Sequence, residues 1–141
     1  MGRRAREEAG ERQVVMILLQ VALGGAIGAS LRYLAGMALM RSLGTAFPYG
    51  TFFVNVLGSF VMGLLAVLLM ERLPGGWSRL SPLLMTGLLG GFTTFSAFSL
   101  DTIYLFERGR HALALFYVGG SVLLSMGGLV AGMALARIGT Q

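Results

Sequence analysis

Cysteine is absent from this 141-residue chain, and histidine occurs only once. These absences exclude disulfide frameworks, thiolate chemistry and metal sites built from histidine and cysteine. Charge is also scarce, since only 12% of the residues are charged, whereas 55% are hydrophobic and the mean hydropathy is +0.77. A soluble globular domain carries about twice that share of charged residues. The composition therefore indicates a membrane protein.

Lysine is missing as well, because all eleven basic residues are arginine. The sequence pI of about 10.8 would suggest a nucleic-acid partner in a soluble protein. Here the arginines lie at the ends of apolar runs, where they anchor a protein in the membrane, so no nucleic acid is expected. No nucleophile with a neighbouring base and no metal-ligand set is visible, and an enzyme is therefore not expected.

Four apolar runs are long enough to cross a bilayer as helices, and short segments with turn signals join them. The runs cover residues 14–38, 49–70, 81–106 and 112–136. Residues 1–13 form a hydrophilic N-terminal tail that we expect to be exposed, and residues 14–141 form one transmembrane domain. The predicted fold class is an all-α membrane protein with four transmembrane helices.

Arginine placement gives only a weak preference for one orientation in the membrane. With the N-terminus inside and the arginines before Arg12 left out, four arginines lie inside and three outside. This balance raises the possibility that the protein inserts in both orientations. Four helices of this length enclose little space of their own, so an ion path would need a partner subunit, most commonly in a two-fold dimer.

Small residues spaced by four occur in every span and predict close packing of the helices. The pairs are Gly24 with Gly28, Ser59 with Gly63, Gly87 with Gly91, and Gly128 with Gly132.

Polar residues inside the spans are the candidates for function, because an unpaired polar group in hydrocarbon costs several kcal/mol. They are Arg32, Asn55, Thr93, Thr94, Ser96, Asp101, Tyr117, Ser121 and Ser125. The last three are four residues apart, so their hydroxyls form a ladder on one helix face that either joins helices or lines a path. Asn55 is likewise a clamp between helices or a ligand. Arg32 either reaches the head groups or attracts anions at a pore mouth.

The stretch GGFTTFSAF, residues 90–98, predicts a break in the third helix, because consecutive glycines and two β-branched threonines are poor helix formers. A break inside a membrane is tolerated only where the freed backbone is buried or lines a cavity, and exposed carbonyls there are able to hold a cation. Phe95 and Phe98 share a helix face. Their rings either pack in the core or turn their positive edges toward an anion.

A small anion would need a row of donors. Moving it from water into a medium of low dielectric costs on the order of 20 kcal/mol, whereas one hydrogen bond to a charged group returns about 1.5–3 kcal/mol. This chain supplies an amide, several hydroxyls and ring edges, with no carboxylate among them except Asp101 at the end of the row.

The combination of these residues resembles the Fluc (CrcB) family of fluoride channels. The matching pieces are GGAIGASLRY in the first span, GTFFVNVLGSF in the second, GFTTFSAF in the third and the Tyr117/Ser121 spacing in the fourth. The resemblance implies an antiparallel, dual-topology homodimer of four-helix subunits in the bacterial inner membrane, with paired pores at the interface and a central structural sodium ion. It also implies passive export of fluoride from the cytoplasm and hence fluoride resistance.

The resemblance assigns roles to particular residues. The fluoride pore would comprise Asn55, Phe95, Phe98, Thr94, Ser96, Tyr117, Ser121 and Ser125, the vestibule Arg32, and the sodium ligands the backbone carbonyls of Gly90 and Thr93. Asp101 matches an acidic position whose role is not assigned. Ala97 departs from the family, which commonly has threonine there, so one hydroxyl of the polar track is missing.

Two other functions compete with this hypothesis. A small dual-topology, proton-coupled exporter of organic cations needs a carboxylate inside the membrane, and the spans offer none before Asp101. A membrane assembly factor without transport activity is the third candidate.

Overall fold

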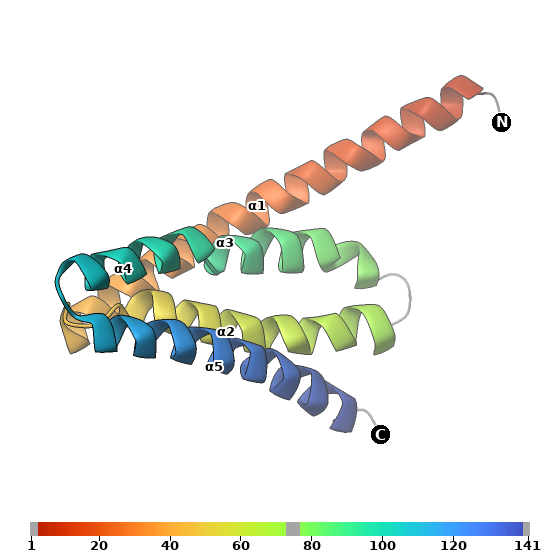
Figure 1. The fold of residues 1–141 in the computed structure, drawn as a ribbon. Coiled ribbons are helices and arrows are strands. Elements are labelled where there is room, and N and C mark those ends of the chain that lie inside the picture. The colour runs from red at the N-terminus through yellow and green to blue at the C-terminus, as the bar shows by residue number, and fades with distance from the viewer. Residues whose placement is uncertain (1–2, 73–76, 140–141) are drawn as a thin grey trace.

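The computed structural model describes residues 3–72 and 77–139, which form a bundle of helices (Figure 1). The elements are α1 (Arg3–Leu43), α2 (Tyr49–Ala66), η1 (Val67–Arg72), η2 (Trp77–Leu80), η3 (Pro82–Leu89), α3 (Gly90–Phe92), α4 (Phe95–Glu107) and α5 (His111–Ile138). Here η1 and η3 are π-helical and η2 is a 3₁₀ turn. The all-helical prediction is confirmed.

Four helical stretches among the described residues are long and apolar enough to cross a membrane. They are Glu7–Leu43, Tyr49–Glu71, Pro82–Glu107 and His111–Ile138, which agree with the four predicted spans. The N- and C-terminal ends of the chain lie at the same end of the bundle, as an even number of crossings requires (Figure 1).

The N-terminal residues before Val14 belong to the same helix as the first span, because α1 runs without interruption from Arg3 to Leu43. At a rise of about 1.5 Å per residue this helix is roughly 60 Å long, about twice the thickness of a bilayer core. Its N-terminal part projects beyond the other helices (Figure 1). The described side chains there, such as Arg4 and Glu7, are exposed.

The helices pack in two closely spaced pairs, α1 along η3 and α3, and α2 along α5. Glycines permit this approach. A Cβ atom added to Gly28 would fall on the backbone of Leu88, and one added to Gly132 would fall on the backbone of Phe60. The predicted close contacts at small residues are therefore present at these positions.

Glycines with positive φ end two of the helices. Gly44 follows α1 with φ 81° and Gly109 follows α4 with φ 71°, a conformation that residues with a side chain rarely adopt. The amide of Gly44 donates to the Met40 carbonyl at 3.0 Å, and the amide of Gly109 donates to the Phe106 carbonyl at 2.9 Å. These turns bring the chain back into the bundle.

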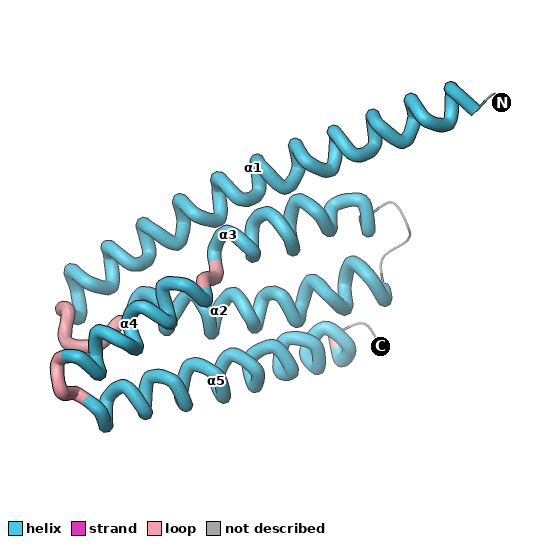
Figure 2. Tube along the Cα trace, turned by 45° about the horizontal axis from the view of Figure 1, so that its top comes forward, coloured by secondary structure: helices cyan, strands magenta, loops and turns pink. Residues whose placement is uncertain are grey.

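The third span is composed of η3, α3 and α4, with a short loop between α3 and α4 (Figure 2). The loop residues Thr93 (φ −84°, ψ 159°) and Thr94 (φ −154°, ψ 122°) have extended backbone. The helix therefore changes its hydrogen-bonding pattern near the middle of the span.

Candidate functional site

The loop between α3 and α4 is held by a side chain from another helix. Asn55 on α2 accepts a hydrogen bond from the Thr94 amide at 2.8 Å, and its Nδ2 donates to the Thr94 carbonyl at 2.9 Å. The Thr94 hydroxyl caps α4 by accepting from the Ala97 amide at 3.2 Å. The side chains of Asn55 and Thr94 thus replace hydrogen bonds that a continuous helix would make.

Because two backbone amides donate to side chains, two backbone carbonyls of the third span lose the amide that would donate to them in a helix. In an uninterrupted α-helix the Thr94 amide would donate to the Gly90 carbonyl, and the Ala97 amide would donate to the Thr93 carbonyl. Both amides donate instead to side-chain oxygens, at 2.8 Å and 3.2 Å. Gly90 and Thr93 are the residues to which the family resemblance assigns the sodium ion.

A pocket with a volume of about 230 Å³, lined by both polar and apolar side chains, lies beside this loop. Its lining residues come from α2, α4, α5 and the loop, and are Asn55, Ser59, Thr94, Phe95, Phe98, Ser121, Val122 and Ser125. The structure therefore brings six of the predicted pore residues to one cavity, although they are up to 70 positions apart in the sequence. None of the lining residues is charged.

Ser121 is the buried polar residue of the pocket, with 4% of its surface exposed. Its Oγ has no hydrogen-bond partner among the described residues. Leaving a buried hydroxyl unpaired costs about 1–3 kcal/mol. A polar occupant of the pocket would recover this free energy.

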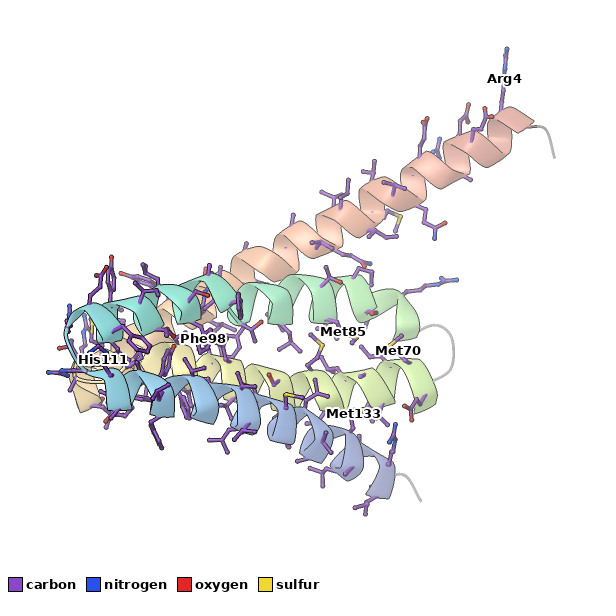
Figure 3. All side chains as sticks on the ribbon, viewed as in Figure 1. Arg4, Met70, Met85, Phe98, His111 and Met133 are labelled. Carbon is purple, nitrogen blue, oxygen red and sulfur yellow. The ribbon has the colours of Figure 1, made fainter. Side chains whose placement is uncertain are left out.

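The two phenylalanines of the pocket differ in their surroundings. Phe98 points from α4 toward α5, where its ring centroid lies 5.3 Å from that of Tyr117 (Figure 3). Phe95 lies 5.6 Å from Phe98 between ring centroids, and 79% of its surface is exposed. One ring is therefore packed and the other is presented at the surface of the subunit.

Tyr117 belongs to a second polar cluster beyond Phe98. Its hydroxyl donates to Asp101 Oδ2 at 3.4 Å, and Thr51 on α2 donates to the same oxygen at 2.7 Å. Tyr117 is fully buried and packs with Leu105 and Ala114. Tyr117 therefore lies next to the pocket but does not line it.

Two further predicted residues also lie outside the pocket lining. Ser96 is exposed, with its Oγ 3.2 Å from the Thr94 hydroxyl. Arg32 is partly buried, and its Nη1 donates to the Thr93 carbonyl at 3.4 Å. Arg32 therefore reaches the loop between α3 and α4, and its vestibule role stays a prediction.

Ser59 and Thr51 belong to these polar clusters, but neither is among the pore residues predicted from the sequence. The sequence predicts Ser59 only as a small packing residue, and Thr51 is not among the candidates. Both are four residues from Asn55, so the periodicity of one helix face was the signal that could have found them.

Within the described residues, no three side chains of histidine, cysteine, aspartate or glutamate are grouped to hold a metal ion. A cation site would therefore depend on backbone oxygens. The Gly90 and Thr93 carbonyls meet the first requirement for a hard cation such as sodium, because they are oxygen donors without their usual amide partners.

The fold and the site together define a small multi-span membrane protein with an uncharged pocket between its helices that includes polar side chains. Residues 19–133 match the family described as "CrcB-like protein, Camphor Resistance (CrcB)". The chain belongs to this family, and it is a multi-pass protein of the bacterial inner membrane.

Curated relatives support the same assignment. The chain is 59% identical over 124 residues to a protein of Cereibacter sphaeroides, an alignment that covers 88% of this chain and 97% of the relative. It is 53% identical over 125 residues to a protein of Ruegeria sp., with 88% and 97% covered, and 54% identical over 119 residues to one of Paracoccus denitrificans, with 84% and 93% covered. All three relatives are named "Fluoride-specific ion channel FluC".

Proposed function

We propose that this protein is a fluoride-selective channel through which fluoride leaves the cytoplasm down its gradient. The observation that carries the proposal is the identity of 59% over nearly the whole length of a relative named as a fluoride-specific ion channel. Passive export of this kind would make the cell resistant to fluoride. The comparisons give no support to the alternative, a proton-coupled exporter of organic cations.

The pocket has the chemistry that a small, strongly hydrated anion needs. Asn55 keeps one Nδ2 hydrogen beyond its bond to Thr94, and three serine hydroxyls line the same cavity. At about 1.5–3 kcal/mol each, four such donors return roughly 6–12 kcal/mol. Since none of these donors is charged, the ion is not held too tightly to leave.

This return is smaller than the cost of dehydrating the ion, on the order of 20 kcal/mol. Retained water and donors from a second subunit would supply the rest. The large exposed surface of Phe95 supports a second subunit at this face, because a ring edge presented at the surface is available to a pore shared between subunits. We therefore propose an antiparallel homodimer, inserted in both orientations, with paired pores along the interface.

In this proposal the interruption of the third span has two purposes. It places the Thr94 side chain and the start of α4 beside the pocket. It also leaves the Gly90 and Thr93 carbonyls without their helical amide partners, so that they would bind a structural sodium ion at the centre of the dimer. A bound sodium ion would balance the partial negative charge of these carbonyls and join the helix ends that carry them.

Fluoride efflux from vesicles tests the proposal. Purified protein reconstituted in liposomes is expected to release loaded fluoride, measured with a fluoride electrode, but not chloride, measured with a chloride electrode. Liposomes without protein are the control for leakage. Release of both anions at the same rate would refute selectivity for fluoride.

A further inference from the structure

We infer that Asn55 is a positioning residue for the cation site as well as a lining residue of the pocket. By accepting the Thr94 amide hydrogen, it prevents that amide from closing a helical bond with the Gly90 carbonyl. This inference rests on the proposed function, because it concerns the sodium ion of that proposal. Asn55 is therefore expected to act on both the anion path and the cation site.

The Asn55 amide holds the loop by two opposed hydrogen bonds to Thr94. Its oxygen lies 2.8 Å from the Thr94 amide nitrogen, and its nitrogen lies 2.9 Å from the Thr94 carbonyl oxygen. Two opposed hydrogen bonds to one residue fix the direction of the backbone on both sides of its Cα. The bond from the Thr94 amide is the one that keeps this hydrogen away from the Gly90 carbonyl, and the bond to the Thr94 carbonyl orients the Asn55 side chain.

Asn55 prevents the loop from closing into a continuous helix. The loop is only two residues long, and helix precedes and follows it. Without an acceptor on α2, the Thr94 amide would remain unpaired inside the membrane at a cost of about 1–3 kcal/mol. The nearest acceptor along the chain is the Gly90 carbonyl, which a continuous helix would use. Closing that bond removes the Gly90 oxygen from the cation site.

A second residue on the same face of α2, Gly58, also lies against the loop. Gly58 lies three residues after Asn55, and a Cβ atom added there would overlap the Thr93 methyl group. Because Gly58 has no side chain, there is room for the Thr93 methyl group against α2. Helix α2 therefore positions the loop twice, by the hydrogen bonds of Asn55 and by the space at Gly58.

The Thr93 oxygen is also within reach of a positive group. Arg32 Nη1 donates to it at 3.4 Å. A sodium ion at this oxygen would therefore have to displace the long contact from Arg32.

The experiment measures how sodium changes the melting temperature of the purified, full-length protein in detergent. Sodium chloride is exchanged for choline chloride at constant ionic strength. A ligand that binds only the folded protein raises its melting temperature, here by about 3–5 °C for each tenfold rise in sodium above the dissociation constant. Fluoride efflux of the same variants is measured in parallel.

Two substitutions at Asn55 separate its roles. Asn55→Leu has a similar size but no acceptor, and we expect it to lose the sodium-dependent rise. Asn55→Asp keeps an oxygen for the Thr94 amide, so the rise should persist while the negative charge stops fluoride efflux. A sodium-dependent rise of full size in Asn55→Leu would overturn the inference.

A second pair of variants applies if Asn55→Leu does not fold. Gly58→Ala displaces Thr93 and should reduce the sodium-dependent rise, whereas Gly119→Ala, where nothing lies within 4 Å, should retain it. An undiminished rise in Gly58→Ala would overturn the inference. No sodium-dependent rise in the wild type would overturn both the inference and the sodium site, while selective fluoride efflux from that protein would leave the channel function standing.

Discussion

Adding one methyl group at Gly132 tests whether the close packing of α2 against α5 shapes the pocket. The Cβ atom of Gly132→Ala would meet three backbone atoms of α2, among them the Leu64 nitrogen at 3.1 Å. The nearest of the three is the Phe60 carbonyl oxygen, closer than 3.0 Å, whereas ordinary contact begins at 3.4 Å. The two helices must therefore separate by at least 0.4 Å, because backbone atoms cannot rotate out of the way.

Gly127→Ala is the matched control, because it lies on the same helix and has nothing within 4 Å of the added Cβ. Both substitutions gain about 0.5–1 kcal/mol from the higher helix propensity of alanine. Only Gly132→Ala also incurs the cost of overpacking, about 1–3 kcal/mol. The difference between the two free energies of unfolding thus isolates the clash, with Gly132→Ala less stable by about 1–3 kcal/mol.

Fluoride efflux should follow the same order. Asn55 and Ser59 on α2 face Ser121 and Ser125 on α5 across the pocket, so separating these helices lengthens hydrogen bonds to any shared ion. We expect slower efflux from vesicles containing Gly132→Ala and unchanged efflux with Gly127→Ala. The two assays are unfolding of the purified protein in detergent and fluoride efflux from vesicles, measured with a fluoride electrode. Equal stability and equal efflux in the two variants would refute the packing argument.

Three other substitutions and one deletion test separate parts of the proposal. Ser121→Ala should slow fluoride efflux about 10- to 150-fold, equivalent to one lost hydrogen bond to an ion, without lowering stability, since it removes an unpaired hydroxyl. Asn55→Asp should abolish efflux while the protein elutes from size-exclusion chromatography at the same volume as the wild type; efflux at the wild-type rate would contradict its pore role. Thr51→Val should lower the free energy of unfolding by about 1–3 kcal/mol, because Asp101 loses a hydrogen bond of 2.7 Å, and an unchanged melting curve would count against that bond. Deleting residues 1–13 should leave efflux unchanged, since the family match begins at residue 19, and a large loss of efflux would assign this segment a role.

The spans and their ends could be predicted from the residues because they depend on local properties. A helix in hydrocarbon satisfies its own backbone hydrogen bonds, so apolar length alone indicates where it crosses. Gly44 and Gly109 end helices through their own positive φ angles. The uninterrupted helix through residues 3–13 was not predicted, because a hydrophilic composition does not distinguish an exposed helix from an irregular tail.

The polar residues could be chosen from the sequence, but their partners could not. Burial in hydrocarbon makes any polar group in a span a candidate, which is why Asn55 and Ser121 were identified. Periodicity says which residues share a face of one helix, but not which face of another helix it meets. Ser121 lines the pocket and Tyr117 does not. This difference depends on how α4 crosses α5.

The sequence by itself determined the membrane class, the four crossings and the row of neutral donors, since composition and spacing are properties of the chain alone. Only the tertiary structure decided that Asn55 on α2 bonds to both sides of Thr94 on the third span. Those hydrogen bonds join residues 39 positions apart, and they form only because the packed helices bring both groups to the same depth. The physical reason is that a hydrogen bond extends over about 3 Å, so it depends on the relative position of helices that no local pattern specifies.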